Sequence, residues 1–433
     1  MSGAHHVVAV VGGATAGAEA ARIFADQGIT TLVIEQHARP YGKVEDGLPR
    51  WHVKLRQKEF RSIDDKLDRP GVHYIPCTRL GTDLPLSELL QTWHLHAIVL
   101  ALGAWKDRSL PIEGIDQYVG KGLLYQNAFI HWMNHRDDPG YDGAQVDIHD
   151  GALVVGGGLA SIDVSKAVQF ELVLKALAER GIREEMIRLE EEGLDSVLAE
   201  HGLRWEDLGL SGARLCYRRR QEDMALAEPP PNPTPEQKKK CETVRFKIAQ
   251  KAIDKFRFRM EPLLSPVDKI VEDDRLVGLV FERMEYEGDG RIRGTGERVS
   301  LRAPLTVSSI GSLPVPIEGI PMKGELYEFT DGRLGTFENL PNVFTVGNAL
   351  TGKGNLVVSR KHASEVAERL AESIAGQVSD IAAFVRTRTP LSDGEMAEVM
   401  GHAQARQAEV GYDGSYEDWM RKVSPPGLRV ERA

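Results

Sequence analysis

The residues with the clearest chemical potential lie in two short glycine-rich segments. The first is VVAVVGGATAG at residues 7–17 and the second is LVVGGGLAS at residues 153–161. Each joins an apolar, β-branched run to an alanine-rich or helical continuation. A strand that turns through glycines into a helix binds pyrophosphate, because backbone N–H groups and the positive end of the helix dipole face the anion. The sequence therefore predicts two dinucleotide-binding turns in one chain.

The first turn departs from the GxGxxG pattern at one position. Gly12 and Gly17 hold the outer positions, whereas Ala14 stands where the pattern has its middle glycine. Glu35 follows the next apolar run, where a carboxylate can accept hydrogen bonds from both ribose hydroxyls. The residues predicted to form this first site are Gly12, Gly13, Ala14, Ala16, Gly17, Glu35 and Gln36.

The second turn is followed by cations instead of an acid. Its next predicted strand, ARLCYRRR, runs into arginines. Guanidinium groups pair bidentately with a 2′-phosphate, which a carboxylate would repel. This site is predicted to bind NADP(H), although a solvated basic turn is the alternative interpretation. Its predicted residues are Gly156, Gly158, Leu159, Ala160, Ser161, Arg218 and Arg219. Two dinucleotides in one chain favour a flavin, FAD, facing a nicotinamide.

The elements that must position these turns alternate between strand and helix. HHVVAVVG reads as a strand, AGAEAARIFADQG as a helix and TTLVIEQ as a second strand. The predicted fold class is α/β, with two Rossmann-like dinucleotide-binding domains. Residues 171–208 are highly charged and helical in period, and they exceed what a minimal βαβ crossover needs. They are predicted to form an inserted helical hairpin.

Composition narrows the class of protein. The net charge of −10 argues against a nucleic-acid partner. Cys77, Cys216 and Cys241 are scattered and form no CxxC, which disfavours a redox disulfide, a zinc ribbon or an iron–sulfur cluster. No metal site is predicted. No apolar run approaches the ~20 residues of a membrane span, and no signal peptide is indicated. We therefore expect a soluble, cytoplasmic protein without a membrane partner.

Seven segments taken together resemble a known family. They are VVGGATAGAEAARI, ARPYGKVEDGLPRWHVK, VLALGAWKDRSLPIEG, VVGGGLASIDVSKAV, YRRRQEDM, SSIG and NVFTVGNALTGKGNLVVSRKHA. Their order resembles that in adrenodoxin-reductase-like ferredoxin–NADP reductases, cousins of the glutamate synthase small subunit. The resemblance spans about residues 7 to 375 and implies an NADP domain (117–299) inserted into a discontinuous FAD domain (1–116 and 300–375). The polar, helical remainder (376–433) is expected to be an appendage on the surface.

The resemblance also implies an activity and further site residues. The activity is hydride transfer between NADPH and FAD, followed by single-electron transfer to a ferredoxin or flavodoxin. The residues implied to lie near the flavin are Gly42, Val44, Gly103, Gly347, Asn348, Gly354, Asn355 and Leu356. His52 and Asp163 match a histidine and an aspartate beside the flavin, which implies proton handling or nicotinamide positioning. A packing histidine and a helix-surface aspartate are the alternative interpretations.

A basic segment suggests where a partner would dock. Residues 236–259 carry nine basic and three acidic side chains. Such a concentration can steer a ferredoxin or a similar acidic electron carrier, here toward Lys247, Lys251 and Lys255, although a solvated helix face explains it equally well. Three other functions stay open: a reductase subunit of a larger complex, a FAD-dependent enzyme acting on an organic substrate, and a non-catalytic nucleotide sensor.

Overall fold

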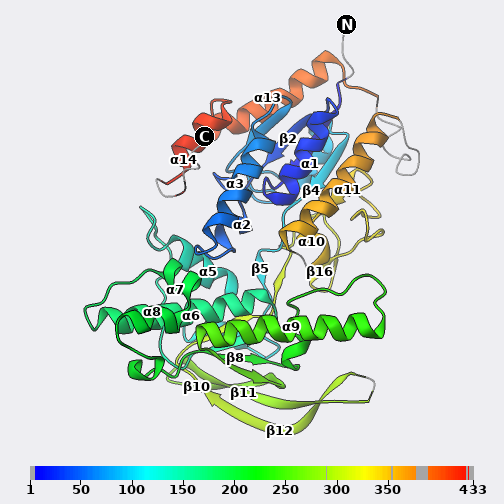
Figure 1. Ribbon diagram of the computed structural model, residues 1–433. Coiled ribbons are helices and arrows are strands. Elements are labelled where there is room, and N and C mark those ends of the chain that lie inside the picture. Colours follow the sequence, from blue (N-terminus) through cyan, green and yellow to red (C-terminus); the bar gives the residue numbers. More distant parts are fainter. Residues whose placement is uncertain (1–4, 289, 353–354, 377–388, 426–427, 429–433) are drawn as a thin grey trace. The chain divides into compact units, whose positions relative to one another are not determined.

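The computed structural model describes residues 5–288, 290–352, 355–376, 389–425 and 428 (Figure 1). The chain forms two compact units. The first unit comprises Met1–Leu48, His52–Lys106 and Ser312–Ala433, and the second comprises Pro49–Trp51 and Asp107–Gly311.

A five-stranded parallel sheet forms the centre of the first unit. Its strand order is β17-β4-β1-β2-β3. The strands are β1 (Val7–Val11), β2 (Thr30–Ile34), β3 (Val72–Ile75), β4 (Ala97–Leu100) and β17 (Val343–Thr345). Alternate residues of β1 enter different clusters: Val8 and Val10 join one, and Val7, Ala9 and Val11 join the other. The sheet is therefore covered on both faces, which explains why its strands read as continuous apolar runs.

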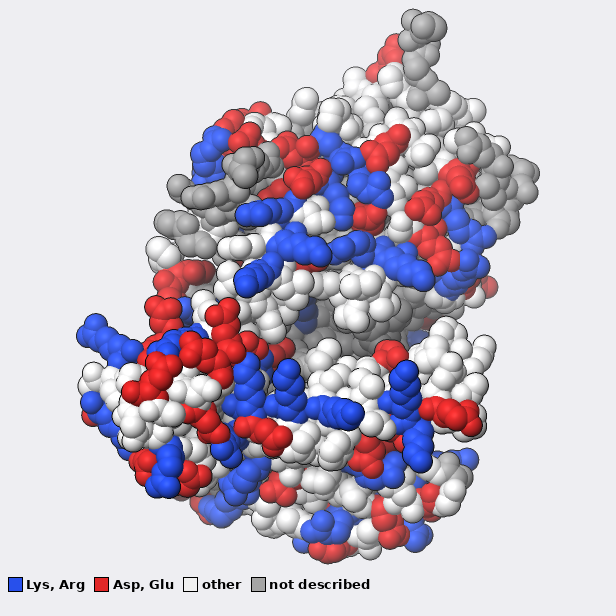
Figure 2. Space-filling view, viewed as in Figure 1, with Lys and Arg blue, Asp and Glu red and all other residues white. Residues whose placement is uncertain are grey.

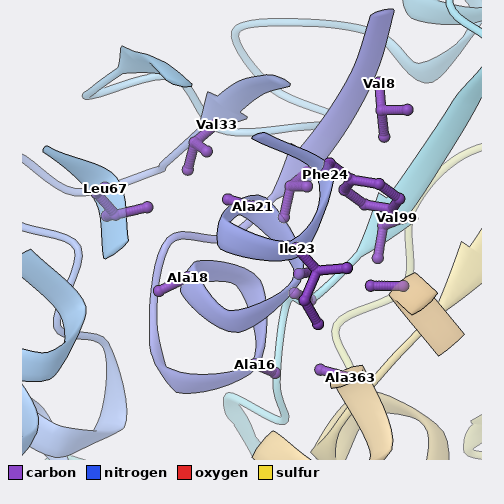
Figure 3. Close-up of a cluster of buried hydrophobic side chains, with 14 of the residues drawn as sticks. Val8, Ala16, Ala18, Ala21, Ile23, Phe24, Val33, Leu67, Val99 and Ala363 are labelled. Atoms are coloured by element: carbon purple, nitrogen blue, oxygen red, sulfur yellow. The ribbon is translucent and has the colours of Figure 1, made fainter. Parts of the chain in front are cut away.

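Small side chains on α1 allow close packing in the first unit. Helix α1 (Thr15–Asp26) packs against α3 (Val53–Leu67) and α11 (Leu356–Ile374). Its alanines share one cluster with strand valines and with α11, as Figure 3 shows. The unit's other elements are α2 (Lys43–Asp46), α4 (Leu86–Thr92), α10 (Asn348–Thr351), α13 (Asp393–Val410), α14 (Tyr416–Val423), β14 (Ser312–Leu313), β15 (Met322–Lys323) and β16 (Leu326–Tyr327).

The C-terminal helices are integral to the first unit. The Tyr416 hydroxyl donates to Asp64 at 2.8 Å, and the Trp419 indole N–H donates to the carbonyl of Ala38 at 2.8 Å. Both side chains are buried in the cluster that contains α1. The segment expected to be a surface appendage therefore supplies part of the core. Residues 377–388 lie outside the described residues.

The second unit repeats the parallel-sheet construction. Its sheet has the order β6-β13-β7-β8-β9. The strands are β6 (Leu123–Tyr125), β7 (Leu153–Gly156), β8 (Arg214–Tyr217), β9 (Arg259–Pro262) and β13 (Thr306–Ser309). A three-stranded antiparallel sheet contains β10 (Leu264–Glu272), β11 (Arg275–Tyr286) and β12 (Ile292–Arg302). The main helices are α5 (Gln126–His135), α6 (Leu159–Ala178) and α9 (Pro235–Phe256), and 3-10 turns lie at Ile115–Tyr118 and Gln221–Asp223.

The boundaries of the second unit differ from the domain boundaries predicted from the sequence. The unit begins at Asp107 after its short first segment and ends at Gly311, whereas the sequence suggested 117–299. Leu110 and Ile112 pack in the cluster under the antiparallel sheet, and β13 pairs with β6 and β7. Strand β5 (Lys106–Asp107) is one of the places where the chain passes between the units. Long-range packing, which local patterns do not report, sets these limits.

The predicted hairpin at 171–208 begins later in the structure. Helix α6 continues without interruption to Ala178, because Leu172, Val173 and Leu177 stay buried on its apolar side. Two short helices follow, α7 (Met186–Glu192) and α8 (Leu194–Glu200), and then a 3-10 turn at Trp205–Leu208. The insertion is thus a compact helical pair after α6. Among the described helices, none combines the length and the apolar character needed to cross a bilayer.

Candidate dinucleotide-binding sites

The first glycine turn is too tight for side chains at its outer positions. It joins β1 to α1, and Gly12 has a φ of +100°. A Cβ on Gly12 would lie 2.6 Å from the carbonyl oxygen of Ala101, and one on Gly17 would lie 1.7 Å from the carbonyl oxygen of Gly12. Both glycines are therefore required for the turn itself, before any ligand is considered.

Ala14 is accommodated by a second glycine from a distant part of the sequence. Gly42 has a φ of +49°, and a Cβ built on it would lie 2.9 Å from the Cβ of Ala14. Because Ala14 replaces the middle glycine of the pattern, the residue opposite it, Gly42, has no room for a side chain. Ala14 is the N-cap of α1 and provides no side-chain cap. The N-terminal N–H groups of α1 are therefore left for another acceptor.

Glu35 is buried beside this turn and holds it in place. One carboxylate oxygen accepts from the N–H of Gly13 at 2.8 Å, and the other accepts from the N–H of His37 at 3.0 Å. Burial raises the pKa of Glu35, although these two backbone hydrogen bonds oppose the rise. Each carboxylate oxygen has a further lone pair, so Glu35 can still accept hydrogen bonds from ribose hydroxyls. Gln36 follows directly and is half-buried.

Two polar atoms near the first turn have no partner among the described residues. They are the hydroxyl oxygen of Thr15, whose residue is 5% exposed, and the side-chain carbonyl oxygen of Asn348. Leaving such a buried group unpaired costs about 1–3 kcal/mol. Thr15 opens α1, and Asn348 opens α10 directly after Gly347, where a Cβ would lie 3.1 Å from that of Ala16. Both orphaned atoms fit a ligand that occupies the turn.

Sequence reasoning missed Thr15. The signal was present, because a hydroxyl residue stands inside the glycine motif at the first position of a helix. The GxGxxG pattern directs attention to glycines and leaves the intervening residues unspecified. Thr15 is marked by a buried hydroxyl without a partner at the first position of α1, and only the structure provides that observation.

The other residues predicted near the flavin divide into backbone and core positions. Gly103 and Gly347 have φ values of +68° and +71°, and Val44 is fully buried in the first unit. Asn355 caps α11, since its side chain accepts from the N–H of Val358 at 3.0 Å. Leu356 begins that helix and is half-buried, and His52 is the N-cap residue of α3. Gly354 lies outside the described residues.

The second glycine turn is built differently. It joins β7 to α6, and a Cβ on Gly156 would lie 2.4 Å from the carbonyl oxygen of Ser309. A Cβ on Gly158 would meet nothing within 4 Å. The Ser161 hydroxyl, at the third motif position, donates to the carbonyl oxygen of Gly158 at 2.7 Å. The serine is therefore part of the turn, while Gly158 leaves open space in front of it. Leu159 is exposed and Ala160 half-buried.

The three arginines after β8 have different surroundings. Arg220 pairs with Asp223 at 3.0 Å and lies over the Tyr286 ring at 4.3 Å. Arg218 is exposed and forms no ion pair within the described part of the chain. Arg219 is half-buried between them in sequence. Arg218 is therefore the guanidinium best placed to bind an added phosphate.

Two further predicted residues have identified neighbours. Asp163, on α6, forms an ion pair with Lys166 at 3.4 Å, and Lys166 also pairs with Glu190 at 2.9 Å. Lys255 of α9 donates to the carbonyl oxygens of Glu190 and Glu191 at 2.5 and 3.1 Å. Lys255 thus anchors α9 to the inserted helices, whereas Lys247 and Lys251 are exposed.

Each unit therefore combines a parallel sheet with a glycine-rich βα turn, and the chain has the architecture of proteins with two dinucleotide-binding folds. The predicted α/β fold class is confirmed. A solved structure, "Mycobacterium tuberculosis FprA in complex with NADPH", is similar with a TM-score of 0.68, at 21% identity, over 94% of this chain and 91% of that chain.

Sequence comparisons identify the particular relatives. NADPH:adrenodoxin oxidoreductase, mitochondrial, of Arabidopsis thaliana is 25% identical over 405 residues, covering 83% of this chain and 80% of the relative. NADPH-ferredoxin reductase FprA of Mycobacterium tuberculosis is 24% identical over 387 residues, covering 79% and 76%. A probable ferredoxin/ferredoxin–NADP reductase of the same organism is 25% identical, covering 82% of this chain but 62% of its own length. No protein-family model matches the chain. The predicted resemblance to adrenodoxin-reductase-like ferredoxin–NADP reductases is confirmed.

Proposed function

We propose that the protein is a FAD-dependent NADPH:ferredoxin oxidoreductase, with NADPH as reductant and a ferredoxin or flavodoxin as acceptor. The observation that carries this proposal is the pair of glycine turns with opposite charge, one beside buried Glu35 and the other followed by exposed Arg218. The names of the relatives support it, since they include NADPH, ferredoxin and adrenodoxin. FAD, when bound, supplies the conversion of a two-electron donor into two single-electron steps.

The first unit is proposed to bind FAD. Its glycine turn presents the uncapped N-terminus of α1, which favours a pyrophosphate. Glu35 is placed to accept from ribose hydroxyls with its remaining lone pairs, and Thr15 would donate to a phosphate oxygen. Asn348 would accept a hydrogen bond from a ligand hydroxyl. The orphaned atoms of Thr15 and Asn348 support an occupant that supplies both an acceptor and a donor.

The second unit is proposed to bind NADP(H). The open space in front of Gly158 admits a pyrophosphate at the N-terminus of α6, a helix of 20 residues. Arg218 would pair with the 2′-phosphate, with Arg219 beside it in sequence. For Asp163 of this unit and His52 of the first unit, the proposed role is proton handling or nicotinamide positioning.

The exposed face of α9 is proposed to dock the acidic iron–sulfur partner. Val244, Lys247, Ile248 and Lys251 follow i, i+3, i+4 and i+7 spacing, which places them on one side of the helix. Val244 and Ile248 are 39% and 37% exposed. Apolar side chains between cations suit a protein interface, where charge guides the encounter and apolar contact holds the complex. Lys255 is not included, because it binds carbonyl oxygens of its own chain.

Reduction of the bound flavin by pyridine nucleotide tests the enzyme assignment. Under anaerobic conditions, one equivalent of NADPH should bleach the purified yellow protein, and NADH should act poorly. A preparation that takes up no FAD, or that bleaches equally with both nucleotides, would contradict the proposal.

Docking at α9 is tested by charge reversal. The variant Lys247→Glu/Lys251→Glu should slow cytochrome reduction through ferredoxin about tenfold at low salt, while ferricyanide reduction stays unchanged. The matched control is Lys175→Glu/Arg183→Glu, which changes the same charge at two other exposed positions. Equal losses in both variants, or in both assays, would count against docking at α9.

A further inference from the structure

A cationic groove lies along α1 and α3 of the first unit. Its volume is about 520 Å³. Six positive side chains line it, together with Gln57, Ser62 and the single carboxylate Asp65. The cations are Arg22, Lys54, Lys58, Arg61, Lys66 and Arg69. Figure 2 shows Lys and Arg side chains gathered over α1 and α3 on this face.

Three of these cations are held in place by carboxylates behind them. Arg22 and Lys66 both pair with Glu19, at 2.6 and 2.8 Å. Arg22 and Arg69 both pair with Asp26, at 2.8 and 2.5 Å. Burial alone would raise the pKa of Glu19, but hydrogen bonds from Arg22 and Lys66 bring it below its usual value. The pairs fix one side of the groove in a defined geometry.

The other three cations have no such partners. Lys54, Lys58 and Arg61 occupy positions i, i+4 and i+7 of α3, so they form a row on one face of the helix. All three are exposed, and none forms an ion pair within the described part of the chain. Six cations against Glu19, Asp26 and Asp65 leave an excess of three positive charges, in a chain whose net charge is −10.

We propose that this groove binds a compact polyanion with several adjacent phosphate groups. The row of cations along α3 repeats at about one helical turn, roughly 5 Å, so it presents charges in line. Arginine forks bind phosphate oxygens bidentately, and lysines add point charges. The lining contains no aromatic or aliphatic side chain, which leaves nothing to hold a nucleobase.

The groove differs from a protein-docking surface and from both glycine turns. It is an open depression whose lining residues are all polar or charged, and a chain of phosphates can contact several of its cations at once, so a small polyanion fits it better than an acidic protein does. None of its lining residues belongs to either glycine turn. The inference therefore does not depend on the proposed oxidoreductase function.

Titration calorimetry of the purified full-length protein with sodium tripolyphosphate tests the proposal. We expect saturable binding at about 0.05 M salt that weakens at about 0.2 M, where screening is stronger. Lys58→Gln/Arg61→Gln removes two exposed cations without touching the Glu19 and Asp26 pairs, and should weaken binding about tenfold. Lys175→Gln/Arg183→Gln is the matched control and should bind as the wild type does.

Two further ligands define what the groove recognises. Orthophosphate should bind at least about tenfold more weakly than tripolyphosphate, because it reaches fewer cations. ATP distinguishes two kinds of polyphosphate ligand. If ATP binds the wild type and the Lys58→Gln/Arg61→Gln variant loses that binding, the groove accepts a triphosphate chain carried by an organic molecule. If ATP does not bind, the ligand is condensed inorganic phosphate.

Two outcomes would overturn the proposal. The first is failure of tripolyphosphate to bind the wild type, and the second is equal weakening in the groove and control variants. If tripolyphosphate fails to bind and the groove variant also reduces ferredoxin more slowly, the surface is a protein-docking site instead.

Discussion

The two glycine turns reach the same strand–turn–helix form by different means. In the first turn, Thr15 has a buried hydroxyl without a partner; in the second, the Ser161 hydroxyl already donates to a turn carbonyl. A buried carboxylate braces the first turn, whereas an exposed arginine follows the strand beside the second. The first turn thus has buried polar groups, Thr15 and Glu35, whereas the charged residue at the second turn, Arg218, is exposed to solvent. The difference predicts which ligand each selects and how each responds to substitution.

Glycine replacement should separate the two turns most strongly. Gly17→Ala places a methyl 1.7 Å from a carbonyl oxygen of the same turn, so the first unit should lose about 3 kcal/mol or more and release FAD. Gly158→Ala meets no atom within 4 Å, so stability should hold while the methyl obstructs NADPH. Urea unfolding followed by flavin fluorescence measures the first effect, and NADPH titration measures the second. Comparable stability in the two variants would remove the contrast.

Charge at the second turn should give the next largest effect. Arg218→Glu replaces a free cation with an anion, so NADPH binding should weaken by about 100-fold, with little change for NADH. Arg220→Gln is the control, because it removes a neighbouring cation that is already paired with Asp223. Dissociation constants for both nucleotides test the prediction. If Arg220→Gln weakens NADPH binding more than Arg218→Glu does, the 2′-phosphate is bound by Arg220 and not by Arg218.

The unpaired hydroxyl of the first turn should act in opposite directions with and without FAD. Thr15→Val removes a buried orphan, so the apoprotein should gain about 1 kcal/mol while FAD binding weakens about tenfold. Ser161→Ala breaks an existing hydrogen bond and should cost stability in either state. Thermal unfolding of apo- and holoprotein, with FAD affinity from flavin fluorescence, distinguishes the two. A Thr15→Val variant that binds FAD normally would show that the hydroxyl faces no phosphate.

The sequence predicts what depends on local pattern and fails where distant residues meet. Strand–turn–helix periodicity revealed both glycine turns, and the parallel sheets follow from the buried apolar runs. The pairing of Ala14 with Gly42 needs tertiary contact across 28 positions (42 − 14), so no local motif contains it. The same holds for Trp419, which donates to the carbonyl of Ala38, and for Lys255, whose charge suggested docking but whose partners are backbone carbonyls. Long-range packing decides these cases.

The pH dependence of stability should give the smallest difference between the two turns. It arises because the first turn has a buried carboxyl group, Glu35, beside it. Burial raises the folded-state pKa of Glu35 above its usual 4.5, so folding favours the protonated form. Its contribution to stability is therefore fully present below the unfolded pKa and is lost as pH rises through the folded value. The apoprotein's first unit should weaken with rising pH across that window. The opposing hydrogen bonds from Gly13 and His37 should keep the change small.

The variant Glu35→Gln should separate this acid from all the others. It starts less stable, because an amide nitrogen cannot accept the N–H that one carboxylate oxygen now accepts, and the contribution of Glu35 to the pH dependence should be absent from its unfolding curve, while that of half-buried His6 and His73 stays. Unfolding free energies of both apoproteins across the pH range provide the measurement. Parallel curves for wild type and variant would show that the pH dependence arises elsewhere. A wild-type stability that rises with pH relative to that of the variant would mean that the backbone hydrogen bonds outweigh burial and keep Glu35 ionised in the folded protein.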